Sequence, residues 1–412
     1  MPPRPEVVEA FRDWDSCLED CFEQLFPPGT WEQDPDRSRR ARMQLHLPVR
    51  LGGFGIRAAA SLSPLSYVCG WAQAARDIAQ LGVAGEEAMF AEYLTTSTGA
   101  EFLDPWFVKA LEQLPATIRH EIPGLPLCVA APPVRLFQAR QRQLAVEELQ
   151  ALRRLARDDA TLARFTSLQG PGAGAWVSAV PAHTDLTFTA AKWGIAAAIR
   201  LGLPIQQLQV AGRCVCGTAH VDPADPHHAL RCKHQHGPSR VHDELLMAGE
   251  AHALEISVAD PLSLSPSLLG QCGRQIGVAA REWERRKTSN YAPLLARSRG
   301  VQFTPLIVET WGCLGGRFQR WLRQQGDAHV GLAVSRGACR EDESVFSTYL
   351  LGSLKALIGV ALQRAQARVI LLRAAFSMGG INVDLVDRER DDVDVEGGAL
   401  WVEAPYMVDT LL

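Results

Sequence analysis

The chain contains 412 residues, of which 47% are hydrophobic and 21% are charged, and its net charge is −4. This length and composition argue against one compact domain and against global disorder, and they allow two or three domains with cores of their own. The negative net charge excludes a positive surface over the whole molecule. Any contact with nucleic acid must therefore come from a local basic patch.

The Cys residues and the start of the chain bear on its compartment. The ten Cys residues have irregular spacing, and residues 1–6 lack the apolar core of a secretory signal. These features favour a reducing compartment. The longest apolar stretches are interrupted well short of the roughly 20 residues that a membrane span needs. We expect an intracellular protein of the nucleus or cytoplasm, with no signal peptide, transmembrane segment or membrane partner.

The first predicted element is a helix over residues 1–26, where acidic and apolar positions alternate at helical spacing until Pro27-Pro28-Gly29. Cys17 and Cys21 lie four residues apart on this helix. A redox pair is one interpretation. Thiols at this spacing more often lie on a buried apolar helical face, so buried thiols are predicted.

The next segments continue the helical pattern. Paired glycines within residues 45–57 imply a tight backbone turn. Residues 58–115 have Ala-rich helical faces, and residues 137–165 carry apolar side chains at 4-3-4 spacing. A further helix at about 186–200 ends in Gly and Pro residues that indicate a boundary near 205–212. The N-terminal part is therefore predicted to be mostly helical.

The pattern changes in the C-terminal part. Two β-like runs, residues 253–258 and 301–308, flank a helical segment at 272–299, and this order predicts a small mixed α/β unit. A long helix is predicted at about 344–373. Residues 381–412 carry nine acidic residues against two Arg and show no helical periodicity. That tail is predicted to be loosely ordered.

A cluster of Cys and His residues has the spacing of a small zinc knuckle. Cys214 and Cys216 are followed by a turn at Gly217, a loop, and then His228 and Cys232. Three thiolates and one imidazole satisfy the tetrahedral coordination of structural zinc, and four protein ligands leave no position for a catalytic water. Because such a loop-rich segment has little core, zinc would contribute directly to its folding.

Two alternatives stay open for this cluster. The first pair is Cys-x-Cys, whereas zinc sites more often use Cys-x2–4-Cys, and free thiols beside surface histidines are the other interpretation. Six of the eleven His residues lie between positions 220 and 242, which favours a metal. His227, His234 and His236 are alternative donors, so the His ligand is less firmly predicted than the Cys ligands.

Several segments occur in a recognisable order along the chain. They are residues 47–57 (LPVRLGGFGIR), residues 172–181 (GAGAWVSAVP), the knuckle with residues 240–242 (RVH), residues 253–258 (ALEISV), residues 287–291 (KTSNY), residues 305–312 (PLIVETWG) and residues 361–368 (ALQRAQAR). The set resembles the C-terminal part of reverse transcriptases from non-LTR retrotransposons that carry a restriction-like endonuclease, of the divergent type found in algal and protist genomes. The resemblance covers most of residues 35–375.

This resemblance implies a restriction-endonuclease-like unit of the PD-(D/E)xK type. In that family, two acidic side chains on adjacent strands hold a divalent metal, and a Lys helps to position the attacking water. Glu255 stands at the place of the second acid. Lys287 and Tyr291 lie at i and i+4 on the following helix and share a face that can approach it. Mg²⁺ is implied only if the nuclease is active.

The sequence departs from the family at the first acid. The family has a strand bearing Pro-Asp before the second acid, and the residues between His242 and Glu255 contain no Pro-Asp. Asp243 and Glu244 are substitutes in principle, but they follow the knuckle directly and fit better as favourable charges in a first helical turn. The polymerase motif Tyr-x-Asp-Asp is also absent from the 412 residues of the sequence, so no DNA synthesis is assigned.

A local basic patch is the candidate surface for DNA or RNA. Trp283 and Tyr291 are interleaved with its cations and can stack on bases. A solvated helix face is the alternative interpretation. The predicted nucleic-acid-binding residues are Arg240, Arg281, Arg285, Arg286, Arg297 and Arg299.

The leading hypothesis is a truncated retrotransposon product that binds zinc and nucleic acid without catalysing cleavage. The alternatives are an active metal-dependent DNA endonuclease and a zinc-stabilised protein-interaction module. The predicted class is α+β, with a mostly helical N-terminal region and a mixed α/β nuclease-like unit. The predicted segments are 1–135 (helical, thumb or post-thumb-like), 136–210 (helical linker), 211–242 (zinc knuckle), 243–375 (nuclease-like remnant) and 376–412 (acidic tail).

Overall fold

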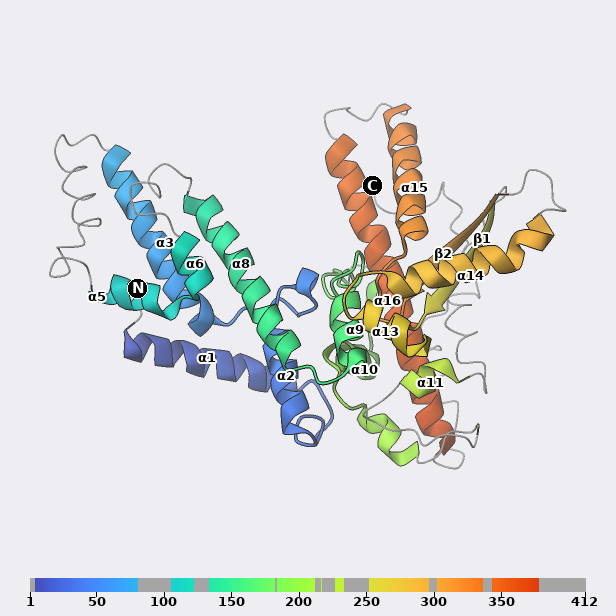
Figure 1. Cartoon of the computed structure of the whole chain (residues 1–412), viewed down its shortest axis with the longest axis horizontal. Coiled ribbons are helices and arrows are strands. Elements are labelled where there is room, and N and C mark those ends of the chain that lie inside the picture. Colours follow the sequence, from blue (N-terminus) through green and yellow to red (C-terminus); the bar gives the residue numbers. More distant parts are fainter. Residues whose placement is uncertain are drawn as a thin grey trace. The chain divides into compact units, whose positions relative to one another are not determined.

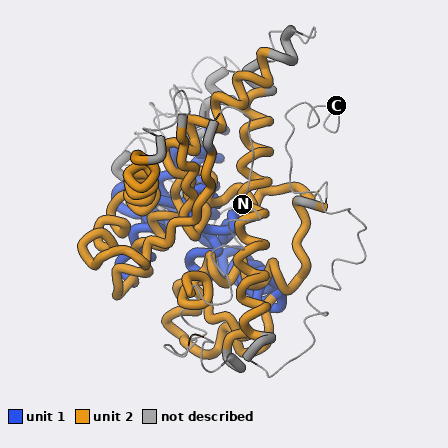
Figure 2. Tube along the Cα trace, turned by 90° about the vertical axis from the view of Figure 1, so that its right-hand side faces the viewer, with its two compact units in different colours: residues 1–25, 42–155 blue, residues 26–41, 156–412 orange. Residues whose placement is uncertain are grey.

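A computed structural model describes residues 4–80, 105–121, 133–181, 184–211, 216, 227–232, 252–295, 302–335 and 343–377. This part of the chain is mostly helical and contains one two-stranded sheet, so the predicted α+β class is confirmed at this coarse level. The chain divides into two compact units (Figures 1 and 2). None of the described helices is long and apolar enough to cross a membrane.

Unit 1 comprises residues 1–25 and 42–155. Its central helix α3 packs against α1, α5 and α8. Helix α3 begins beside Asp15 of α1, whose carboxylate accepts hydrogen bonds from the backbone N–H groups of Ala59 (2.7 Å) and Ala60 (2.9 Å). These bonds satisfy donors that a helix start leaves without intrahelical partners. The described elements of unit 1 are α1 (Pro5–Glu23), η1 (Val49–Leu51), α3 (Ala59–Gln80), α5 (Pro105–Gln113), α6 (Ala116–Glu121) and α8 (Pro133–Arg154).

Helix α1 buries a different face from the one predicted. Asp15 and Phe22 are its buried residues, whereas Cys17 and Cys21 are exposed. The capping role of Asp15 turns an acidic position inward, and this rotation leaves the two thiols on the exposed side of the helix, away from Asp15. The prediction of buried thiols was therefore wrong.

The turn and the helix predicted next show how local chemistry sets boundaries. The paired glycines form the expected tight turn: Gly52 has a φ of +96°, and a Cβ on Gly53 would lie 1.9 Å from the Leu47 carbonyl oxygen. The helix predicted over residues 137–165 is two helices, α8 and α9 (Asp159–Ser167). Asp158 begins α9 by accepting a hydrogen bond from the Thr161 N–H (2.6 Å).

Unit 2 comprises residues 26–41 and 156–412. Helix α2 (Pro35–Leu45) begins in this unit and ends in unit 1. The other described elements are α9 (Asp159–Ser167), η2 (Thr184–Leu186), α10 (Ala190–Leu201), η3 (Gln206–Ala211), α11 (His227–Arg231), β1 (His252–Ala259), η5 (Pro261–Ser263), α13 (Pro266–Cys272), α14 (Val278–Leu295), β2 (Gln302–Glu309), α15 (Gly316–Ser335) and α16 (Glu343–Ser377).

The two predicted strands are confirmed and pair in parallel. Glu255 of β1 lies opposite Pro305 of β2, and Ala259 lies opposite Glu309. Parallel neighbours need a crossover connection, which α13 and α14 supply. The single predicted helix at 272–299 is interrupted between them, where Gly277 adopts a φ of +73° that favours glycine.

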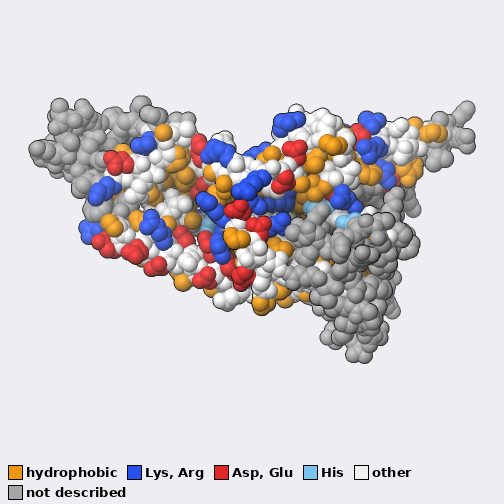
Figure 3. Space-filling view, turned by 60° about the horizontal axis from the view of Figure 1, so that its bottom comes forward, with side chains coloured by type: hydrophobic (Ala, Val, Ile, Leu, Met, Phe, Trp, Pro, Cys, Tyr) orange, Lys and Arg blue, Asp and Glu red, His pale blue; other side chains and the backbone are white. Residues whose placement is uncertain are grey.

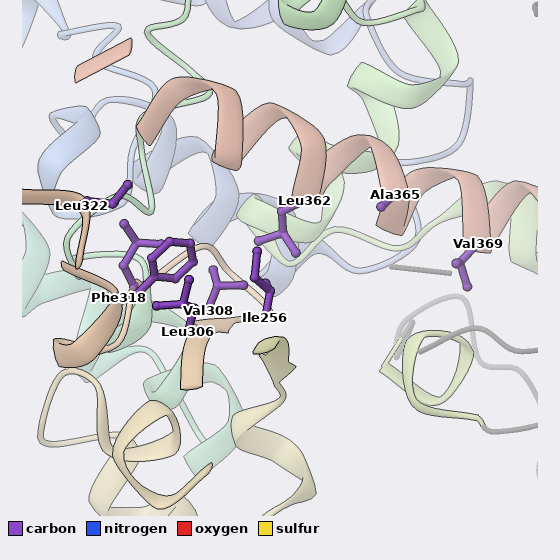
Figure 4. Close-up of a cluster of buried hydrophobic side chains, with 9 residues drawn as sticks. Ile256, Leu306, Val308, Phe318, Leu322, Leu362, Ala365 and Val369 are labelled. Carbon is purple, nitrogen blue, oxygen red and sulfur yellow. The ribbon is translucent and has the colours of Figure 1, made fainter. Parts of the chain in front are cut away.

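Side chains on the two faces of the sheet enter separate cores. Ile256, Leu306 and Val308 pack against Phe318 of α15 and Leu362 of α16 (Figure 4). The opposite face, which includes Ala259 and Ile307, packs on α9, α13 and α14. Because neighbouring residues of a strand point to opposite faces, the sheet forms a middle layer covered on both sides.

The long C-terminal helix is confirmed as α16 and passes through unit 2 (Figure 1). The predicted acidic tail begins near its end, and residues 378–412 lie outside the described part of the chain. The division between the units falls after Leu155, and residues 26–41 join the second unit, which residue patterns did not predict. The five predicted segments are finer than these units and stay a prediction.

Candidate metal centre and neighbouring sheet

Cys216, His228 and Cys232 lie together in unit 2 and can hold a metal ion. Their ligand atoms all lie within 4.8 Å of one another, and Cys216 Sγ is 3.5 Å from His228 Nε2. The short helix α11 supplies the His, and the Cys232 N–H donates to the His228 carbonyl at 2.9 Å. This i, i+4 spacing places the imidazole and the thiol on one side of the turn. The fourth predicted ligand, Cys214, lies outside the described residues.

The structure distinguishes the two adjacent histidines. His227 is buried and stacks edge-on against Trp311, with ring centroids 5.3 Å apart, and its Nδ1 lies 3.7 Å from Asp260 Oδ2. His228 turns the other way, toward Cys216. Among the described histidines, His228 is therefore the candidate ligand. His234 and His236 lie outside the described residues.

Three polar contacts attach the metal cluster to the rest of unit 2. Arg231 Nε lies 3.1 Å from Asp260 Oδ2, at the end of β1, and Arg231 Nη1 donates to the Leu262 carbonyl at 2.9 Å. From α16, Arg373 Nη2 donates to the Cys232 carbonyl at 2.9 Å. Cys232, Asp260 and Arg373 are all buried. A metal ion in this cluster would join Cys216 to a helix that these contacts already attach to the rest of unit 2.

Glu255 and Lys287 come together on the other side of the sheet. The Lys287 ammonium of α14 donates to Glu255 Oε1 of β1, and both side chains are about four-fifths buried, with 22% and 17% of their surface exposed. Tyr291, one turn further along α14, stacks on Phe303 of β2 at a centroid distance of 4.6 Å. Glu255 and Lys287 are therefore in contact, whereas the Tyr291 ring packs against Phe303. Their catalytic roles stay predictions.

The sheet brings no second acid to Glu255 in its described residues. Pro305, which lies opposite, has no ligand atom in its side chain, and Glu309 is the only acidic residue of β2. Glu309 lies four residues further along its strand, a separation of about 13 Å at the usual rise of about 3.3 Å per residue. A shared Mg²⁺ requires oxygens at about 2.0–2.1 Å from the ion. Asp243 and Glu244 lie outside the described residues.

The carboxylate of Glu309 already has partners. It accepts hydrogen bonds from Ser167 Oγ (2.5 Å) and from the Ala280 N–H in the first turn of α14 (3.1 Å). Burial raises the pKa of Glu309, while the bond from Ser167 lowers it. An acid at the end of an apolar strand is the one sequence signal for this residue, and no residue pattern indicates its partners. Glu309 therefore connects β2, α9 and α14.

The described part of the basic patch is partly neutralised within α14. Arg285 Nη2 lies 2.8 Å and Arg286 Nε 2.7 Å from Glu282 Oε1, and these bonds lower the pKa of Glu282 to about 2. Arg281 donates to the Ile276 carbonyl at 3.0 Å. Basic and acidic side chains are interspersed on the face of the molecule that Figure 3 shows. Arg240, Arg297 and Arg299 lie outside the described residues.

Three of the segments that carry the family resemblance meet beyond the end of β2. A Cβ on Gly172 would lie 3.3 Å from the Gly312 carbonyl oxygen and 2.8 Å from Leu314 Cγ. Next to these residues, the Leu314 N–H donates to the Pro171 carbonyl (2.9 Å). From α16, Gln366 Nε2 donates to the Thr310 carbonyl at 2.9 Å. Glycine is therefore required where the 170–174 loop approaches the turn after β2.

Comparisons of the chain with protein-family models, with curated proteins and with solved structures give no match.

Proposed function

We propose that this chain is a retrotransposon-derived fragment of a reverse transcriptase and endonuclease that binds structural zinc and contacts nucleic acid without cleaving it. The observation that supports this most directly is the order of the two sites. A Cys/His cluster that can hold a metal is followed by a β1–α14–β2 unit that joins Glu255 to Lys287. This is the order of the family that the sequence resembles.

Zinc is the metal that this donor set favours. Two thiolates, which are soft ligands, and an imidazole are typical of structural zinc, whereas Mg²⁺ and Ca²⁺ require oxygen ligands. Cys214 would complete the tetrahedral set. The contacts of Arg231 and Arg373 would hold the ligand-bearing turn in place when the ion is bound.

The absence of cleavage is inferred from the surroundings of Glu255. Its partner on the sheet is Pro305, and one carboxylate oxygen is bonded to Lys287. Among the described residues of the sheet, one acid with one ammonium supplies neither the charge nor the number of oxygens that a catalytic Mg²⁺ uses. Lys287 then serves to neutralise a largely buried carboxylate.

Metal content tests the first part of the proposal. We expect about one zinc per chain in the purified protein and a loss of bound zinc in Cys232→Ser and Cys216→Ser. Cys272→Ser is the matched control, because Cys272 is a buried thiol outside the cluster. Unchanged zinc in both ligand variants would remove the cluster from the proposal.

Plasmid nicking tests the second part. The protein is incubated with supercoiled DNA and Mg²⁺ or Mn²⁺, and Glu255→Ala is compared with wild type. We expect no nicking above background in either sample. Nicking by the wild type that disappears in Glu255→Ala would overturn the non-catalytic proposal and support an active endonuclease.

Salt titration separates nucleic-acid binding from the protein-interaction alternative. Binding of a labelled duplex is measured by anisotropy at increasing salt. Phosphate contacts release counterions, so the logarithm of affinity should fall linearly with the logarithm of salt concentration. A shallower dependence of affinity on salt in Arg285→Gln/Arg286→Gln would assign those two residues to the phosphate contacts. No duplex binding at low salt would refute the nucleic-acid part of the proposal.

A further inference from the structure

The exposed side of helix α1 carries an apolar stripe. Ala10, Trp14, Cys17 and Cys21 follow one another at spacings of four, three and four residues, which places them on one helical face. All four are exposed, and Trp14 has 59% of its surface accessible. Leu25, four residues beyond Cys21, is 55% exposed. Two of the six large hydrophobic residues found exposed in the described part of the chain thus lie along this one stripe.

An acidic stripe runs beside the apolar one. Glu6, Glu9, Asp13 and Asp20 are exposed and occupy positions spaced by three, four and seven residues, again along one face. Arg12 is the only basic residue within α1. Figure 3 shows acidic side chains along the lower left of the visible face, where α1 lies in Figure 1. The other acids of the helix have internal roles, as when Asp15 caps α3 and Glu23 pairs with Arg42 at 2.6 Å.

The stripe adjoins the buried face of the same helix. Phe22 is buried and packs edge-on against Phe54 (5.1 Å), and the partly buried Leu18 lies four residues after Trp14 and four before Phe22, between the two faces. The apolar arc of α1 is therefore wider than the part that unit 1 covers. A contiguous exposed apolar strip rimmed by charge is typical of a protein-interaction surface.

Charge decides which occupant fits. A second copy of α1 would bring two acidic stripes together, and the acidic residues 381–412 of the same chain would do likewise. A helix with an apolar seam flanked by Lys and Arg satisfies both stripes at once. This is helix recognition through anchors at heptad spacing, with a Trp as the central anchor.

We propose that the Ala10–Trp14–Cys17–Cys21 face of α1 binds a basic amphipathic helix of a partner protein. Trp14 provides the apolar anchor, and Glu9 and Asp13 select for positive charge. This function is independent of the metal cluster and of the Glu255 site.

The test uses the full chain and two synthetic helical peptides of three heptads with Leu at the seam, one flanked by Lys and the other by Glu. Peptide binding is measured by anisotropy, and cover of the face is measured by protection of Cys17 and Cys21 from iodoacetamide, read by peptide mapping. We expect the Lys peptide alone to bind and to protect both thiols. Trp14→Ala should weaken its binding by at least about tenfold.

Two further variants keep the proposal falsifiable. Glu9→Gln/Asp13→Asn should weaken binding and flatten its salt dependence, whereas Val180→Ala, at a residue 72% exposed in unit 2, should leave both unchanged. Equal binding of the two peptides, undiminished binding by Trp14→Ala, or sedimentation showing a dimer that Trp14→Ala dissolves would each overturn the proposal.

Discussion

The metal cluster and the Glu255 site differ in how the chain assembles them. His228 and Cys232 come from one helical turn, and Cys216 precedes His228 by 12 residues. Glu255 and Lys287 come from a strand and a helix that are 32 residues apart. The first site follows from local spacing, whereas the second depends on how α14 crosses the sheet. A second acid depends further on strand register, and the register places Pro305 opposite Glu255.

The largest expected effect on stability, and the first test of this difference, comes from removal of the metal. Chelation or Cys232→Ser should lower the free energy of unfolding of unit 2 by about 4 kcal/mol or more, because structural zinc binding is itself folding free energy. Chemical denaturation with and without added zinc measures the loss. Glu255→Gln should leave zinc content unchanged. A stable, metal-free protein would show that the polar contacts alone hold α11 in place.

The next largest effect on stability is expected at Glu309, which belongs to neither the metal cluster nor the Glu255 site. Glu309→Leu would leave the Ser167 hydroxyl and the Ala280 N–H without their acceptor and should cost about 2–4 kcal/mol. Glu309→Gln is the milder control, since its carbonyl oxygen can still accept one bond. Equal unfolding free energies for Glu309→Leu and wild type would show that the connection between β2 and α14 is dispensable.

The same residue predicts a pH dependence. Burial raises the pKa of Glu309 above its usual value of 4.5, so the folded protein binds this proton more tightly than the unfolded chain. Stability from this group is present below about pH 4.5 and is lost as pH rises toward the raised pKa. Denaturation at a series of pH values should therefore show a flatter profile for Glu309→Gln over that window. A profile identical to wild type would contradict the prediction.

A smaller effect is expected from the Glu255–Lys287 pair. The two side chains are partly exposed, so a double-mutant cycle with Glu255→Gln and Lys287→Met should give a coupling of about 1 kcal/mol. Single variants should not alter zinc content. A coupling near zero would leave both residues free for another role and would weaken the argument that Lys287 neutralises Glu255.

The smallest effect on stability is expected at Glu282. Glu282→Gln should change the unfolding free energy by less than about 0.5 kcal/mol, because Arg285 is exposed and surface pairs contribute little. It should raise affinity for a DNA duplex by freeing Arg285 and Arg286. Glu6→Gln, on α1, is the control. An unchanged affinity would remove these two arginines from the nucleic-acid surface.

Residue patterns predicted the elements of unit 2 well where one signal dominated. The β-like runs became β1 and β2, and α16 lies where the long helix was expected. Boundaries were missed where a single residue ends or begins a helix, as Asp158 begins α9 and Gly277 separates α13 from α14. Such helix boundaries depend on local backbone geometry, which the periodicity of apolar residues does not reveal.

For the sites, the sequence determined the donor types and their spacing around Cys216, His228 and Cys232, because i, i+4 geometry is local. Only the tertiary structure decided that His227 faces Trp311, that Lys287 reaches Glu255, and that the acid of β2 lies far along its strand. It also decided that Cys17 and Cys21 are exposed, since the cap that Asp15 gives to α3 fixes the rotation of α1. The spacing of residues along one helix follows from the sequence alone, whereas helix rotation and strand register depend on partners distant in sequence.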